Sequence, residues 1–206
     1  MKLTQLTVGQ LQVNCYIIET GLNGAIIIDG GANPQGILSL VERNGLTIKA
    51  ILFTHGHFDH VGAINALKEK TSAPIYIHAE DEELLVEPKK SFGNFYGMFE
   101  SFDSIKPDVL LHDGDIIEVD DVTIKVIHTP GHTKGSSIFL CGDMIFSGDT
   151  LFCNSIGRTD LYGGDMVTMQ NSLLKIASIE GEYKILPGHG EHTTLSYEKQ
   201  TNPYMM

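Results

Sequence analysis

The segment THGHFDH at residues 54–60 constrains this chain more than any other feature. It places four potential metal ligands within six residues: His55, His57, Asp59 and His60. The apolar run 50–53 directly before it predicts a buried strand. His55 and His57 lie two residues apart, so on an extended segment leaving that strand their side chains can point the same way. Nitrogen and oxygen ligands of this kind suit zinc, iron or manganese.

The alternative interpretation of this segment is a polar loop with ordinary histidines, one of which caps a helix. A single histidine is usually explained that way. Here only Gly56 and Phe58 separate four ligand-type side chains. We therefore interpret the segment as a metal site, with Asp59 near the first turn of the helix that follows.

Strand and helix patterns recur along the whole chain. Hydrophobic periodicity and turn residues predict strands at 3–8, 14–19, 25–28, 50–53, 74–77, 115–119, 122–127, 136–140, 144–146 and 183–186. Helices are predicted at 34–44, from the metal segment to about 70, at 79–86 and at 166–178. Strands in both halves with interspersed helices indicate a layered α/β sandwich. A length of 206 residues fits one domain spanning 1–206.

Three more candidate ligands follow predicted strands later in the chain and lie beside glycines: His132, Asp149 and His189. Strand ends are rigid places from which to present ligands. Together with the first cluster they make seven ligands. A mononuclear site needs only three or four, so this number suits two metals that share one carboxylate.

Four motifs in this order resemble the metallo-β-lactamase superfamily over nearly the whole chain. They are THGHFDH at 54–60, PGHT at 130–133, SGDTLF at 147–152 and PGHG at 187–190. Within that superfamily the chain is most similar to the glyoxalase II-like hydrolases, through aspartate at position 149, GRTD at 157–160 and EKQTNPY at 198–204. The long C-terminal helical domain of the larger glyoxalase II enzymes is absent, so the chain resembles their short form.

This resemblance implies a four-layer αββα sandwich and a defined ligand set. It places one metal on His55, His57 and His132. It places a second on Asp59, His60 and His189, with Asp149 bridging the two. Asp29 matches a position that hydrogen-bonds a metal-site residue, although a turn-stabilising role explains it equally well. Arg158 matches a basic residue near the thiol-carrier part of the substrate, with a structural ion pair to Asp160 as the alternative.

The resemblance also implies an activity. The protein would use two divalent metal ions to hydrolyse a hydroxyacyl thioester such as S-lactoylglutathione. Zinc is the expected metal, with iron and manganese as alternatives. Asp59 is expected to orient the attacking hydroxide or accept its proton. One alternative is a mononuclear iron persulfide dioxygenase that uses His55, His132 and Asp149. Others are hydrolysis of a lactone or β-lactam and a metal-binding protein without catalysis. The metal, the thiol carrier and the oligomeric state do not follow from the sequence.

Charge, cysteine spacing and the N-terminal segment argue against several other classes of protein. A net charge of −12 argues against nucleic acid as a partner, because phosphate binding needs clustered Lys and Arg. The three cysteines form no CxxC pair, which is typical of a reducing cytosol. The N-terminal segment lacks a signal-peptide core, and no apolar run approaches the roughly 20 residues that span a bilayer. We therefore expect a cytoplasmic protein that acts on a small molecule, away from membranes.

The segment 87–107 is the least regular part of the chain. Its apolar residues are Phe92, Phe95, Tyr96, Met98 and Phe99. They form either a lid over the site or a loop packed on the core, and we favour packing.

Overall fold

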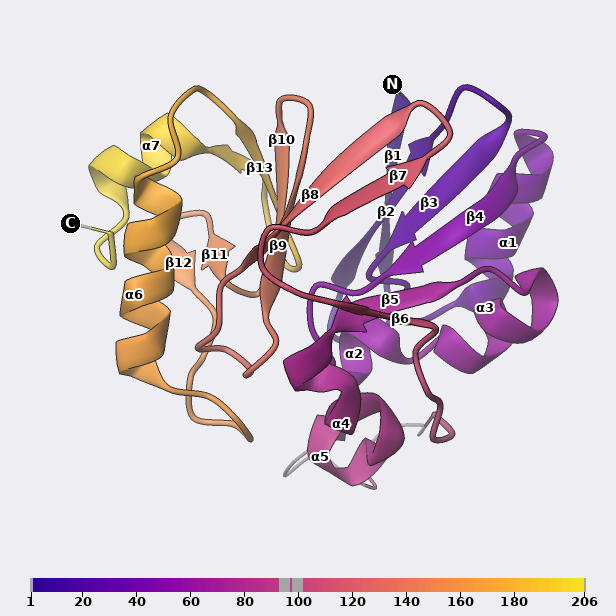
Figure 1. Ribbon diagram of the computed structural model, residues 1–206, viewed down its shortest axis with the longest axis horizontal. Coiled ribbons are helices and arrows are strands. Elements are labelled where there is room, and N and C mark those ends of the chain that lie inside the picture. The colour runs from indigo at the N-terminus through magenta and orange to yellow at the C-terminus, as the bar shows by residue number, and fades with distance from the viewer. Residues whose placement is uncertain (1, 93–96, 98–101, 206) are drawn as a thin grey trace.

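Two six-stranded sheets face each other in the computed structural model, which describes residues 2–92, 97 and 102–205 (Figure 1). The first sheet runs, in order, β1 (Lys2–Val8), β2 (Val13–Glu19), β3 (Gly24–Ile28), β4 (Thr47–Leu52), β5 (Ile75–His78) and β6 (Val109–Leu111). The second runs β14 (Thr193–Thr194), β13 (Lys184–Pro187), β10 (Met144–Gly148), β9 (Ser137–Cys141), β8 (Val122–His128) and β7 (Ile116–Val119). A small hairpin joins β11 (Leu151–Phe152) to β12 (Ser155–Ile156).

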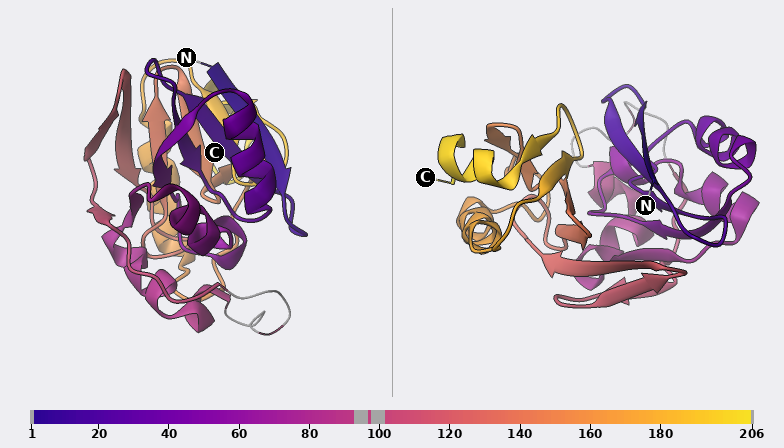
Figure 2. Two further views of the ribbon diagram at one scale, coloured as in Figure 1. Left: turned by 90° about the vertical axis from the view of Figure 1, so that its right-hand side faces the viewer. Right: turned by 90° about the horizontal axis from the view of Figure 1, so that it is seen from above.

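Helices cover the outer face of each sheet. Helices α1 (Pro34–Arg43) and α3 (Ile64–Thr71) lie outside the first sheet, and α6 (Met166–Ala177) and α7 (Leu195–Thr201) lie outside the second. Figure 2 shows the same division from above, with the orange and yellow helices at one end and the purple ones at the other. The remaining short helices are α2 (Phe58–Val61), η1 (Ala79–Asp81), α4 (Glu82–Val86) and α5 (Pro88–Phe92).

Three separate hydrophobic clusters hold these layers together. In β3, Ile27 faces α1 and α3, whereas its neighbours Ile26 and Ile28 face the second sheet, as the two-residue period of a strand requires. The cluster between the sheets contains, among others, Tyr16, Ile26, Leu52, Phe139 and Phe146. The third cluster joins α6 to the second sheet through Met169, Leu173, Ile138 and Ile145. The prediction of a four-layer αββα sandwich is confirmed.

Direct hydrogen bonds between the sheets fix the ends of the strands that carry the candidate ligands. The Asn14 amide donates to Gly188 O at 2.8 Å. The Tyr16 hydroxyl donates to Pro187 O at 2.8 Å. On the other side of the cluster, the Ser137 amide donates to Thr54 O at 2.9 Å. The segments after β4 and β13 are therefore held against the opposite sheet.

The predicted continuous helix from the metal segment to about residue 70 is wrong. The structure has two helices, α2 and α3, that are separated at Gly62 and Ala63. The turn at residues 30–31 causes the break: the Ala63 amide donates to Gly30 O at 3.2 Å. A Cβ atom on Gly62 would also collide with Gly31 O. The turn therefore packs where a continuous helix would need room for a side chain.

Several short elements were not predicted: β6, β11, β12, β14, α5 and α7. In the irregular segment 87–107, α5 ends at Phe92, which is buried and stacks on Phe58 with ring centroids 4.4 Å apart. Phe102 is buried as well. These two described residues pack on the core. Phe95, Tyr96, Met98 and Phe99 lie outside the described residues, so for them packing stays a prediction.

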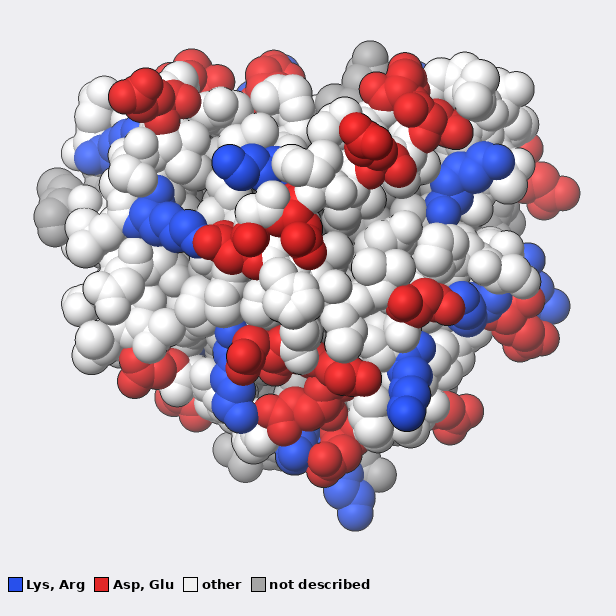
Figure 3. All heavy atoms as spheres, viewed as in Figure 1, with Lys and Arg blue, Asp and Glu red and all other residues white. Residues whose placement is uncertain are grey.

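No helix within the described ranges combines the length and the apolar character needed to cross a bilayer. On the face drawn in Figure 3, acidic side chains are spread among Lys and Arg, and no continuous basic area is visible there. The absence of a nucleic-acid partner stays a prediction.

We expect Phe146→Ala to lower the free energy of unfolding by about 3–5 kcal/mol, the usual cost of emptying a fully buried aromatic position. Leu174 is 66% exposed on α6 and serves as the control, since Leu174→Ala should change stability by less than about 0.5 kcal/mol. Denaturant unfolding measures both. Equal effects would contradict the assignment of Phe146 to the core between the sheets.

Candidate metal centre

Four strand ends and one short helix bring the seven candidate ligands together. His55 and His57 lie on the loop after β4, and Asp59 and His60 lie on α2. His132, Asp149 and His189 follow β8, β10 and β13. These three strands run in the same direction, since β10 pairs with β13 in parallel and with β8 through the antiparallel β9. Their carboxyl ends therefore meet at one edge of the second sheet, opposite the end of β4.

The seven side chains form overlapping groups whose ligand atoms lie within 4.8 Å of one another. The groups are His55, His57 and His132; His55, His60 and Asp149; and Asp59, His60 and His189. The Asp149 carboxylate lies between them, with Oδ1 3.3 Å from His60 Nε2 and Oδ2 3.6 Å from His132 Nε2. Its Oδ2 also lies 3.5 Å from His189 Nε2. The first and third groups coincide with the two triplets that the resemblance implies.

Three histidines are oriented by hydrogen bonds on the side of the ring away from the cluster. His60 Nδ1 donates to the buried carboxylate of Asp29 at 3.0 Å. His132 Nδ1 donates to the main-chain oxygen of Arg158 at 2.7 Å. His189 Nδ1 donates to Leu11 O at 3.0 Å. Each bond orients the ring so that its Nε2 faces the cluster, which is how metal-binding histidines are usually held.

Asp29 also fixes the beginning of the loop that carries His55. Its Oδ1 accepts the Thr54 amide at 2.8 Å, and its Oδ2 accepts the Thr54 hydroxyl at 2.7 Å. The structure therefore places Asp29 in contact with a candidate ligand and with the residue before another one.

Unpaired buried atoms indicate that the cluster suits metal ions. His55 Nε2 and Asp149 Oδ1 are buried, and neither has a hydrogen-bond partner among the described residues. Leaving such groups unpaired costs about 1–3 kcal/mol each. His57 Nδ1 and His132 Nε2 lie only 2.8 Å apart, although His132 already donates a hydrogen bond from its other ring nitrogen to Arg158 O. A cation with oxygen and nitrogen ligands would satisfy all of these atoms, so the residues fit the implied metals.

The electrostatic environment favours the protonation states that metal binding needs at His57 and Asp149, whereas the neighbouring carboxylates Asp149 and Asp59 raise the pKa of His60 and His189 although burial opposes this. Burial, and then the neighbouring His132, lower the pKa of His57 to about 3. Burial alone would raise the pKa of Asp149, but His60 beside it holds that pKa well below its usual range. At neutral pH His57 is therefore a neutral ligand and Asp149 an ionised one, as coordination requires.

A cavity of about 290 Å³ opens onto the cluster. Apart from candidate ligands its lining includes the apolar side chains Leu11, Phe58, Phe92 and Leu161, together with Arg158. The Arg158 guanidinium is half exposed and forms two hydrogen bonds with Asp160, at 2.6 and 2.8 Å. Both of its predicted roles, substrate contact and ion pair, are therefore compatible with its position.

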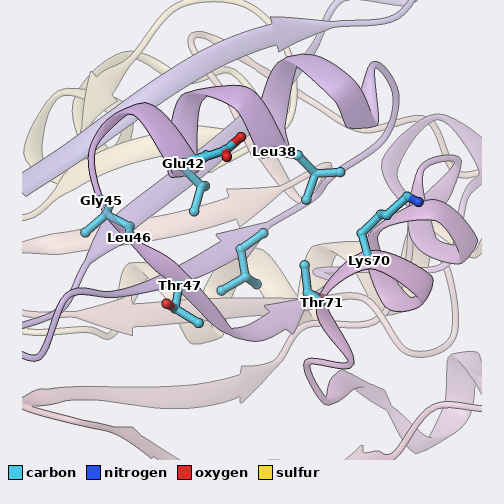
Figure 4. A pocket seen from close by; sticks show the side chains of 9 residues that line it. Leu38, Glu42, Gly45, Leu46, Thr47, Lys70 and Thr71 are labelled. Carbon is cyan, nitrogen blue, oxygen red and sulfur yellow. The ribbon is translucent and has the colours of Figure 1, made fainter.

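A larger cavity, of about 620 Å³, lies away from this cluster, between α1 and the end of α3 (Figure 4). Leu38, Glu42, Lys70 and Thr71 are among its lining residues. None of the seven candidate ligands lines it, so volume alone does not locate the chemistry.

The other histidines lie outside the three ligand groups. His128 stacks on His78, with ring centroids 3.8 Å apart, and His112 lies 6.1 Å from His78. His192 Nε2 lies 3.4 Å from the Tyr16 hydroxyl. Sequence reasoning missed the main-chain oxygens of Leu11 and Arg158, because a carbonyl carries no sequence signal.

Known proteins are similar to this chain in sequence and architecture. A family model described as "Metallo-beta-lactamase superfamily" matches residues 8–189. The chain is 33% identical to "Hydroxyacylglutathione hydrolase GloC" of Haemophilus influenzae, over 100% of this chain and 98% of that protein. Among solved structures, BLEG-1, described as a B3 metallo-beta-lactamase, gives a TM-score of 0.93 at 33% identity and covers 100% of both chains. TTHA1623 in a di-iron-bound form gives 0.87 at 38% identity, over 98% of this chain and 99% of that one.

We expect Gly188→Ala to remove bound metal. A Cβ atom there would collide with Asp149 Oδ1 and lie 2.6 Å from His60 Cε1, and both side chains are confined by burial. Elemental analysis of the purified variant measures the loss. Gly45→Ala is the control: its φ of +67° makes alanine strained by about 1–2 kcal/mol, but nothing lies within 4 Å of the added atom. Full metal content in Gly188→Ala would contradict the close approach.

Proposed function

Because the chain belongs to the metallo-beta-lactamase superfamily, we propose that it is a dinuclear metal-dependent hydrolase that cleaves a hydroxyacyl thioester. S-lactoylglutathione is the representative substrate, and the products are a hydroxy acid and a free thiol. The observation that carries the proposal is the pair of ligand triplets that meet at Asp149. The similarity to a protein described as a hydroxyacylglutathione hydrolase supports the substrate class.

Each ligand triplet would hold one of the two metal ions. His55, His57 and His132 would hold one metal, and Asp59, His60 and His189 the other, with Asp149 between them. Metal ions bound here would supply a water molecule of lowered pKa and polarise the carbonyl oxygen of the substrate. Zinc is the proposed metal, with iron and manganese as alternatives, and the di-iron form of TTHA1623 shows that iron occupies a similar fold.

Asp59 is the residue proposed to orient the attacking water molecule or to accept its proton. Its Oδ2 lies 3.2 Å from His189 Nε2, and the residue lines the cavity that adjoins the cluster. His60 and His189 hold its pKa below the usual value although burial opposes this, so the carboxylate is ionised at neutral pH. An ionised carboxylate at this position can orient water or accept its proton. The leaving thiolate is stable enough to depart without a strong general acid.

A second candidate function is β-lactam hydrolysis, because BLEG-1, which matches the whole chain, is described as a B3 metallo-beta-lactamase. Both reactions use water to attack a carbonyl carbon, so the cluster is compatible with either. The two reactions differ in their leaving group. The measured preference between a thioester and a β-lactam therefore decides between the two functions.

We expect protein purified without added metal to contain close to two metal ions per chain and to hydrolyse S-lactoylglutathione. Elemental analysis gives the metal content, and release of free thiol gives the rate. A β-lactam and a persulfide, the latter followed with an oxygen electrode, are assayed in parallel. A single iron with oxygen consumption and no hydrolysis would replace the proposal with a persulfide dioxygenase.

The matched variants for this experiment are His57→Ala and His112→Ala. The first removes a ligand and should lower the rate by more than about 100-fold, beyond the 10–100-fold effects known for residues that only support ligands. The second removes a histidine whose side chain is 69% exposed and lies outside the ligand groups, so the rate should not change. An unchanged rate in His57→Ala would favour a metal-binding protein whose cluster is not catalytic.

Arg158→Ala tests the proposed substrate anchor. If the guanidinium binds the thiol-carrier part of the substrate in the ground state, the variant should raise KM several-fold and leave kcat nearly unchanged. Asp160→Ala leaves the cation in place but removes its partner, so KM should stay the same or fall. Equal losses of stability in both variants with unchanged KM would show that the ion pair serves only the fold.

A further inference from the structure

A buried carboxylate outside the ligand set connects the two loops that carry the first triplet. Asp81 ends the short helix η1 and is 1% exposed. Its Oδ2 accepts the Gly56 amide at 2.9 Å and the Thr133 hydroxyl at 2.7 Å. Its Oδ1 accepts the Gly135 amide at 2.7 Å. Three donors from two separate loops therefore converge on one side chain.

The positions of these donors relate Asp81 to particular ligands. Gly56 is the residue between His55 and His57, and Thr133 directly follows His132. All three members of the first triplet are thus adjacent in sequence to a residue that Asp81 holds. The backbone fits tightly here, since a Cβ atom on Gly135 would lie 2.6 Å from the Asp81 amide nitrogen.

The second triplet is held by different groups. His60 donates to Asp29, and His189 donates to Leu11 O. Among the described residues, the hydrogen bonds of Asp81 do not reach α2 or the loop after β13. Asp29 thus contacts both sides, through His60 and through Thr54 before His55, whereas the hydrogen bonds of Asp81 reach only the loops of the first triplet.

We propose that Asp81 is a positioning residue that sets the distance between the His55–His57 loop and the His132 loop, and so determines metal affinity at the first triplet alone. The inference rests on the proposed metal centre and adds to it a residue that tunes one of its two halves. Residues that support ligands in this way typically change metal affinity by about 10–100-fold.

The informative substitution is Asp81→Asn, because it keeps the volume and removes one acceptor. An amide side chain accepts through a single oxygen, so its NH₂ group must face either the Gly56 or the Gly135 amide. Either the Gly56 amide, the link to the His55–His57 loop, or the Gly135 amide, one of the two links to the His132 loop, then loses its acceptor. Thr133→Val removes the hydroxyl that bonds Asp81 and Ser136 and leaves both backbone links to Asp81, so it is a milder variant that is less prone to misfolding. Thr133→Ser keeps the hydroxyl and should behave as the wild type.

The experiment separates the two triplets before testing Asp81. His189→Ala weakens the second triplet, and His57→Ala weakens the first. In each background, the affinity for Zn²⁺ is measured by competition with a chromophoric chelator, with and without Asp81→Asn. We expect a loss of about 10–100-fold in the His189→Ala background and no change in the His57→Ala background. Cobalt-substituted samples give an independent readout, since a displaced ligand changes the visible absorption.

Asp108→Asn is the matched control. Its carboxylate accepts the Ile75 amide and the Lys68 ammonium, each at 2.7 Å, so the chemical change is the same at a place that supports no ligand loop. It should lower stability without changing either affinity. Equal losses in both backgrounds, or none in the His189→Ala background, would overturn the inference. No zinc-dependent thioesterase activity in the wild type, with the affinity pattern intact, would instead refute the proposed function alone.

Discussion

The packing of the two sheets through their apolar faces is the interaction on which the rest of the structure depends. Phe139 and Phe146 of the second sheet share a cluster with Ile26 and Leu52 of the first. Burial on both faces explains why β3 reads as an uninterrupted apolar run. Because the sheets face each other, the loops after β4 and after β8, β10 and β13 converge, although they come from opposite halves of the chain. The metal cluster is a consequence of that convergence.

Local sequence patterns predicted much of this arrangement, for identifiable reasons. The hairpin around Asp120 and the helix beginning at Pro34 depend on turn chemistry and periodicity within a few residues. The metal segment at 54–60 was recognisable because its ligands are adjacent in sequence. The triplets themselves came from a family resemblance, and the structure brings those side chains together in the same groups.

The features that were missed depend on contacts between distant segments. Asp81 lies 25 residues from Gly56 and 52 from Thr133, and nothing in its local sequence separates it from its acidic neighbours. The break between α2 and α3 comes from the turn at residues 30–31, which precedes the helix by about thirty residues. Such features follow from the packing of the sheets, which the strand pattern indicates only in outline.

Hydrogen bonding separates the roles of three buried carboxylates that the sequence shows only as aspartates. Both oxygens of Asp29 and both oxygens of Asp81 accept hydrogen bonds from the protein. Asp149 is different, since its Oδ1 is buried without a donor. The donors to Asp29 and Asp81 all come from within the fold, so these two residues belong to its framework. His60 already favours the ionised form of Asp149, and the unpaired Oδ1 together with the two ligand triplets around it makes this carboxylate the one suited to bind a cation.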